Sequence, residues 1–82
     1  MAATRREVVI DPVALEMMSA ARPTDAEREA LVQVLRELAT DVSRGYRILF
    51  VHPPTYRLDV GRFRIHFRVT EQQVQVEFIG IY

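Results

Sequence analysis

Apolar and polar side chains alternate without a break over residues 61–69, GRFRIHFRV. This period of two is typical of a β-strand that buries one face. The positions on its other face are all basic: Arg62, Arg64, His66 and Arg68. A solvated face needs only polarity, so three guanidinium groups and an imidazole in a row indicate a binding surface.

Two neighbouring segments, 56–60 and 74–82, extend this strand into a predicted antiparallel meander. Two-residue turns at 60–61 and 71–72 would place the apolar partners together on one face. These predicted pairs are Leu58–Phe63, Tyr56–Ile65, Ile65–Phe78, Phe67–Val76 and Val69–Val74. The same register predicts these pairs on the basic face: Asp59–Arg62, His66–Glu77, Arg68–Gln75 and Arg57–Arg64. Like charges directly across a strand pair are destabilising. The Arg57–Arg64 pair therefore indicates two guanidinium groups that converge on an anion.

Helical periodicity precedes the meander. Asp11 and Pro12 predict the N-cap and first residue of a short helix. Thr24 and Glu27 form a capping box that begins a longer helix, for which Gly45 is the expected stop. Its apolar stripe recurs at helical spacing: Leu31, Leu35, Leu38 and Val42.

The chain of 82 residues has room for one domain. A short apolar run at 6–10 predicts a first strand, and residues 46–51 hold a further strand candidate ahead of Pro53 and Pro54. We therefore expect one α+β domain over residues 1–82, with two layers in the order β-α-α-β-β-β. The antiparallel meander would pack on an N-terminal helical hairpin.

Composition narrows the setting of the protein. The net charge is zero, but residues 1–43 carry five Arg against eight acids, and residues 44–82 carry six Arg against three. Cysteine is absent and the two His lack ligand spacing, so neither a metal site nor a cofactor is expected. No stretch has the length of a membrane span or of a signal peptide's apolar region, which predicts a cytoplasmic protein.

The block YRLDVGRFRIHFRV at 56–69 resembles the Y-R-L-x-V-G-x-[YF]-R-[IV]-x-[YF]-R-[IV] pattern of the RelE/ParE superfamily of bacterial toxins. The resemblance implies the toxin component of a type II toxin–antitoxin system, or a toxin-derived homologue, with a role in plasmid stabilisation. It implies either a RelE-like endoribonuclease that cleaves mRNA on the ribosome (an mRNA interferase) or a ParE-like poison of DNA gyrase. The expected partner is a cognate antitoxin protein.

Carried over by residue, the resemblance assigns Arg64 to the scissile phosphate and places Arg57 on a strand that supplies further basic contacts. Asp59 departs from the pattern, which favours a basic residue there, and it would neutralise part of the site through Arg62. Nucleases of the family continue past the last strand into a short tail with acid–base residues, and we expect that tail to be absent beyond Tyr82.

The residues themselves suggest further roles. His66 is the candidate general base or acid for attack by a ribose 2′-OH, although pairing with Glu77 for local stability is the alternative. Arg62, Arg68 and Tyr82 are candidate substrate-binding residues. The alternative for Arg57 and Arg64 is that they have no functional role and are solvated strand residues whose side chains point apart.

Two other functional classes stay open. In the first, the chain binds gyrase or the antitoxin through the same face without catalysis, which the expected absence of the tail favours. In the second, it is an assembly module that recruits partners by strand addition. Ile79 and Ile81 are predicted on the face away from the helices, where they would suit a homodimer or a partner interface.

Overall fold

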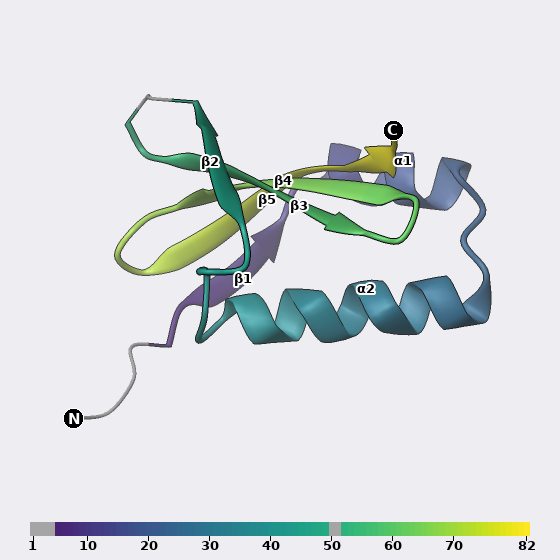
Figure 1. Ribbon diagram of the computed structural model, residues 1–82, viewed down its shortest axis with the longest axis horizontal. Coiled ribbons are helices and arrows are strands. Elements are labelled where there is room, and N and C mark those ends of the chain that lie inside the picture. Colours follow the sequence, from purple (N-terminus) through teal and green to yellow (C-terminus); the bar gives the residue numbers. More distant parts are fainter. Residues whose placement is uncertain (1–4, 50–51) are drawn as a thin grey trace.

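A five-stranded mixed sheet forms one layer of the fold in the computed structural model, which describes residues 5–49 and 52–82 (Figure 1). Its strand order is β1-β5-β4-β3-β2, with β1 parallel to β5 and the other neighbours antiparallel. The elements are β1 (Glu7–Ile10), α1 (Pro12–Ala20), α2 (Asp25–Leu38), β2 (Tyr46–Leu49), β3 (Thr55–Val60), β4 (Phe63–Val69) and β5 (Gln73–Ile81). The predicted α+β class is confirmed. The strand candidate at 46–51 forms β2 as far as residue 49, and residues 50–51 lie outside the described residues.

Both helices begin where the sequence predicts. The Val13 amide donates to Asp11 Oδ1 at 2.8 Å, and Pro12 occupies the first turn. The capping box of α2 is complete, because the Glu27 amide donates to Thr24 Oγ1 at 3.1 Å and the Thr24 amide donates to Glu27 Oε1 at 2.9 Å. Each cap satisfies backbone donors that have no partner inside the helix.

The predicted stop of α2 at Gly45 is wrong, since the helix ends at Leu38 with Ala39 as its C-cap. Asp41 then accepts hydrogen bonds from the Ser43 amide and hydroxyl at 2.9 and 2.6 Å, which favours a turn over further helix. Gly45 has a different role. A Cβ there would lie 2.5 Å from Phe67 Cζ, so only glycine allows this close approach.

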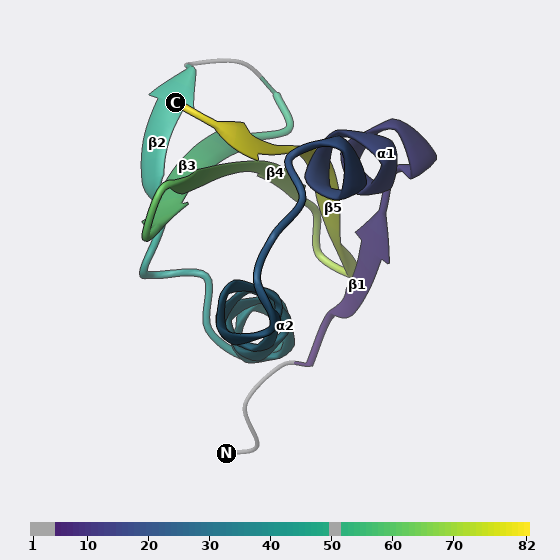
Figure 2. The same ribbon diagram turned by 90° about the vertical axis from the view of Figure 1, so that its right-hand side faces the viewer.

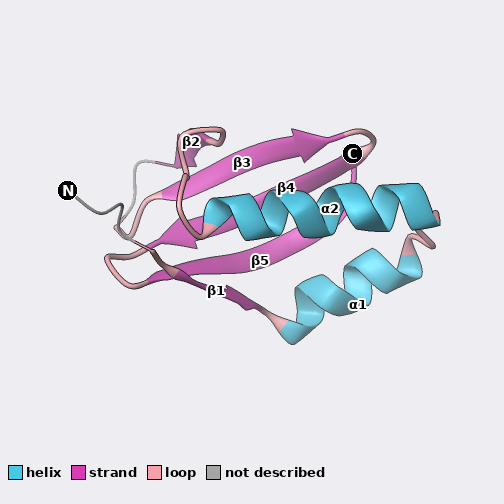
Figure 3. Ribbon diagram, turned by 90° about the horizontal axis from the view of Figure 1, so that it is seen from below, coloured by secondary structure: helices cyan, strands magenta, loops and turns pink. Residues whose placement is uncertain are grey.

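The sheet arches over α2, whose buried residues form the centre of the core (Figure 2). They pack against the inward side chains of β3, β4 and β5, including Phe63, Ile65 and Phe67. Helix α1 lies instead beside β5, beyond the point where β1 ends (Figure 3). The two helices therefore diverge and do not pack along each other as the expected hairpin would.

The β3–β4 hairpin has the predicted faces but a different register. Val60 pairs with Phe63, so the two-residue turn is Gly61–Arg62 and not 60–61. Gly61 has φ +57°, a left-handed conformation that two-residue hairpin turns require and that glycine adopts at no steric cost. The predicted pairs are therefore wrong by two residues, and Leu58 faces Ile65 while Tyr56 faces Phe67.

The β4–β5 hairpin has the predicted register from the turn as far as Val76. Val69–Val74, Arg68–Gln75 and Phe67–Val76 are confirmed as pairs. Beyond Val76 the register shifts at a β-bulge, in which Glu77 is the extra residue. The predicted pairs Ile65–Phe78 and His66–Glu77 are wrong for this reason, because Ile65 faces Ile79 and His66 faces Phe78.

Because of the bulge, the prediction that Ile79 and Ile81 lie on the face away from the helices is wrong. An extra residue reverses which side chains face the core, since the side-chain period of a strand is two. Ile79 is fully buried, and Ile81 pairs with the core residue Phe63 while remaining 48% exposed. The two isoleucines therefore do not form an outward interface, and Phe78 takes the outward position.

Candidate functional site

The outward face of the sheet, opposite the side chains of the core, carries one row of register partners from four strands. This row is Tyr46, Arg57, His66 and Phe78. The next row contains Asp59, Arg64 and Gly80. We call the face defined by these two rows the basic face. Gly80 leaves room for the Phe78 ring, because a Cβ there would lie 2.8 Å from Phe78 Cζ.

Arg57 and Arg64 do converge, although not as direct partners. The two-residue shift of the β3–β4 register places Arg57 opposite His66 and Arg64 opposite Asp59, so the predicted Arg57–Arg64 pair is wrong. Both guanidinium groups instead approach the same oxygen, Asp59 Oδ1, with Nε distances of 3.9 Å for Arg57 and 3.2 Å for Arg64. A carboxylate thus relieves the repulsion that the two cations would otherwise feel.

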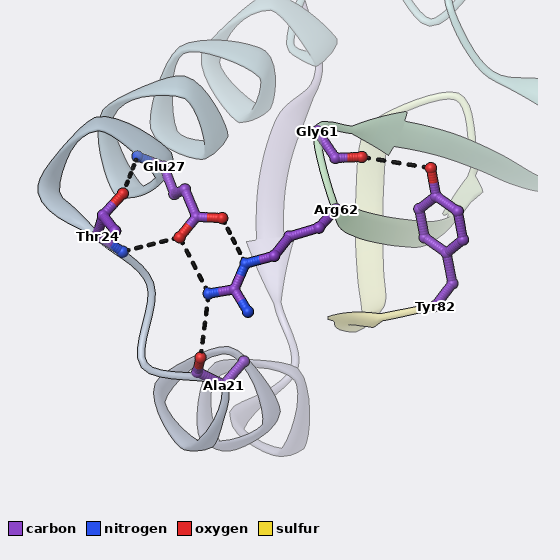
Figure 4. A network of polar contacts seen from close by, with 6 residues as sticks. All are labelled: Ala21, Thr24, Glu27, Gly61, Arg62 and Tyr82. Carbon is purple, nitrogen blue, oxygen red and sulfur yellow. Dashed lines mark hydrogen bonds and ion pairs between the residues drawn. The ribbon is translucent and has the colours of Figure 1, made fainter.

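Arg62, a predicted substrate-binding residue, lies in a different contact. It forms a bidentate ion pair with Glu27, with Nε–Oε2 at 2.5 Å and Nη2–Oε1 at 3.0 Å, and it also donates to the Ala21 carbonyl oxygen (Figure 4). Asp59 therefore does not neutralise part of the site through Arg62, as the sequence predicted, and contacts Arg57 and Arg64 instead. The ion pair lowers the pKa of Glu27 to about 2 and connects the β3–β4 turn to the start of α2.

Arg68 is also engaged by an acid. Its Nε lies 2.7 Å from Glu77 Oε1, an ion pair that the bulge makes possible. Glu77 thus faces Arg68 and does not pair with His66, the partner that the sequence predicted.

His66 packs on an aromatic ring. Its imidazole lies 4.9 Å from the Phe78 ring, centroid to centroid, at an interplanar angle of 31°. Burial lowers the pKa of His66, and the positive charges of Arg64 and Arg57 lower it further. This environment favours the neutral imidazole, the form that can accept a proton.

Two tyrosines flank the arginines. The Arg64 guanidinium lies 4.3 Å from the centre of the Tyr82 ring, and the Tyr82 hydroxyl donates to the Gly61 carbonyl oxygen at 3.3 Å (Figure 4). The Arg57 guanidinium lies 5.0 Å from the Tyr46 ring and donates to its hydroxyl at 3.3 Å. That hydrogen bond, aided by the Asp59 charge, raises the pKa of Arg57. Such cation–π contacts hold both guanidinium groups in place.

The structure thus brings together four of the six predicted site residues: Arg57, Arg64, His66 and Tyr82. The other two form ion pairs elsewhere, Arg62 with Glu27 and Arg68 with Glu77. Sequence reasoning missed Tyr46 and Phe78 as parts of the face. The sequence held no turn signal for Tyr46, because its pairing with Arg57 depends on the β2–β3 register, which the turn at Gly61 does not set.

Known proteins add no constraint on this face, because no protein-family model and no curated protein sequence matches the chain. Within residues 5–49 and 52–82, no group of three or more His, Asp or Glu side chains could hold a metal ion. Over the same residues, no helix is long and apolar enough to cross a membrane.

Proposed function

We propose that the chain is the toxin component, or a toxin-derived homologue, of a type II toxin–antitoxin system and acts as a RelE-like, ribosome-dependent mRNA interferase. The observation that carries the proposal is the convergence of Arg57 and Arg64 on one oxygen, with a neutral His66 in the register position next to them. The resemblance of residues 56–69 to the RelE/ParE pattern supplies the class of target.

Cleavage of RNA by its own 2′-OH needs no protein nucleophile. It needs a positioned phosphate, positive charge to stabilise the pentacovalent transition state and a group that takes the 2′-OH proton. Arg57 and Arg64 supply the charge, and the neutral imidazole of His66 takes the proton. The attacking 2′ oxygen then bonds to phosphorus while the bond to the 5′ oxygen breaks. The departing 5′ oxygen takes a proton from water, which leaves a 2′,3′-cyclic phosphate and a 5′-hydroxyl.

A second candidate function uses the same face without catalysis. The Asp59 carboxylate already lies near both guanidinium groups, which supports the binding of a carboxylate at this place. An acidic segment of an antitoxin, or of gyrase, would bind in the same way.

Induced expression in a bacterial host separates these functions. We expect growth arrest with mRNA cut at ribosome-bound positions in the wild type, and loss of both in Arg64→Ala. Arg28→Ala is the matched control, because Arg28 is exposed on α2 and its guanidinium lies 3.5 Å from Asp25 Oδ1, away from the basic face. Intact mRNA with trapped gyrase–DNA complexes would contradict the nuclease and favour the ParE-like activity. Normal growth with abundant, folded wild-type protein would contradict both toxic activities.

A further inference from the structure

A groove runs between β1 and the second half of α2, on the side of the sheet that α2 covers and away from the basic face. Its volume is about 690 Å³, which lies in the range of small-molecule sites. The Arg6 amide donates to the Ala39 carbonyl oxygen at 2.7 Å and joins the two walls at one end. Because β1 and α2 run in opposite directions (Figure 3), the walls at the other end are Ile10, the last residue of β1, and Val32.

The two ends of the groove differ in chemistry. Arg5 and Arg6 come directly before β1, and Arg36 lies about one helical turn before Ala39, so positive charge gathers toward the joined end. The opposite end is apolar. There Val32 is 41% exposed, and a ligand that covered it would remove apolar surface from water. The walls between the two ends are also apolar, at Val8 and Leu35.

The three arginines of the groove form no ion pair within residues 5–49 and 52–82. Arg6 Nε donates to the Thr70 carbonyl oxygen at 2.8 Å, which holds the side chain without removing its charge. Glu7 also lines the groove, and its Oε1 accepts a hydrogen bond from Gln73 Nε2 at 3.0 Å. The lining thus has an excess of positive charge, and guanidinium forks match the two oxygens of a carboxylate.

Charge at one end and apolar walls toward the other match a ligand with an anionic head and a hydrocarbon tail. A peptide strand added to β1, which is the edge of the sheet on this side, would place side chains along the whole groove. Such a strand gives no reason for the cations to gather at one end. Val32 and Ala39 lie about 10 Å apart along the axis of α2, which limits the tail to a medium length.

We propose that the groove between β1 and α2 binds a free medium-chain fatty acid, with its carboxylate at the arginine end and its tail along the apolar walls toward Val32. The site lies apart from the basic face, so this inference goes beyond the proposed function and does not depend on it.

Titration of the full chain with decanoate, below the concentration at which decanoate forms micelles, tests the inference by NMR. We expect saturable shifts of the backbone amide signals of Val8, Ile10 and Val32, and no shift at His66 on the basic face. Hexanoate should bind at least roughly tenfold more weakly, because a shorter tail covers less apolar surface. Shifts without saturation, shifts confined to the basic face, or equal binding of the two acids would overturn the inference.

Two variants test the two ends separately. Arg36→Ala removes one cation and should weaken decanoate binding about two- to fivefold, the usual effect of one exposed ion pair. Val32→Asp places a negative charge against the tail and should weaken binding at least roughly tenfold. Both side chains are exposed, so the fold should tolerate these changes. Arg28→Ala changes an exposed arginine of α2 outside the groove lining and is the matched control, which should bind as the wild type does. Wild-type affinity in both Arg36→Ala and Val32→Asp would overturn the inference.

A synthetic hexapeptide of alternating valine and glutamate is the competing ligand, because it has the pattern of a strand that would extend the sheet at β1. Binding of this peptide in the groove without binding of decanoate would overturn the inference and assign the edge to strand addition. Growth arrest and mRNA cleavage in cells do not depend on either ligand. Failure of the fatty-acid site would therefore leave the proposed function standing.

Discussion

His66 and Phe78 are register partners on β4 and β5, and their rings lie 4.9 Å apart, centroid to centroid. The contact exists only because the bulge at Glu77 brings Phe78 to the basic face. Burial and two nearby arginines both disfavour the charged imidazole, so the local structure favours the neutral form of His66.

Removal of the ring should therefore raise the pKa of His66. We expect Phe78→Ala to move it back toward 6.5, while Phe78→Leu, which keeps an apolar cover, should hold it low. A titration of the imidazole signals by NMR measures both. An unchanged pKa in Phe78→Ala would show that Phe78 contributes nothing to the lowering.

The lowered pKa of His66 also predicts the pH dependence of folding. Above pH 6.5 the imidazole is neutral in both the folded and the unfolded states, and its favourable environment stabilises the fold. As pH falls from 6.5 to the lower folded value, the unfolded chain binds the proton first and stability decreases. Urea denaturation of the wild type and of His66→Gln should diverge over this range, and parallel pH profiles would contradict the assignment.

The bulge makes opposite predictions for two isoleucines. Ile79→Ala should lower the free energy of unfolding by about 2–5 kcal/mol, because Ile79 is fully buried. Ile81→Ala should cost less, since Ile81 is 48% exposed. Chemical denaturation of both variants measures the difference. Equal losses, or a larger loss at Ile81, would contradict the observed register of β5.

The ion pair between Glu27 and Arg62 predicts a second pH dependence, at acid pH. The pKa of Glu27 falls from 4.5 to about 2 on folding, so its contribution to stability is complete above pH 4.5 and is lost as pH falls toward 2. In Glu27→Gln this contribution should vanish, although glutamine keeps the capping box. Glu29→Gln, an exposed change on the same helix, is the control, and identical acid unfolding of all three proteins would refute the role of the ion pair.

Much of the fold was predictable because strand patterns have a period of two. The error in the β3–β4 register was two residues, so Arg57, Arg64 and His66 stayed on the face that the sequence predicted. Their pairing was not predicted. Gly61 could have located the turn, since a positive φ is needed at its first central position, which Val60 would have occupied in the expected register.

The β5 bulge was harder to predict. Val74 and Val76 are one residue out of phase with Ile79 and Ile81, but Phe78 between them continues the first phase and hides the change. The ion pairs that remove Arg62 and Arg68 from the basic face depend on these details and on the approach of α2. A sequence pattern contains no information on such contacts between distant elements.

Single-turnover cleavage of mRNA on programmed ribosomes tests whether Arg57 and Arg64 act together on one phosphate, as we propose. Arg57→Ala and Arg64→Ala should each slow cleavage by about 10²–10³-fold, the usual effect of removing one donor to a charged transition state. Arg68→Ala, which removes an arginine already engaged by Glu77, should cleave at close to the wild-type rate. Equal rates for all three variants, or a loss confined to Arg68→Ala, would contradict the assignment of the site.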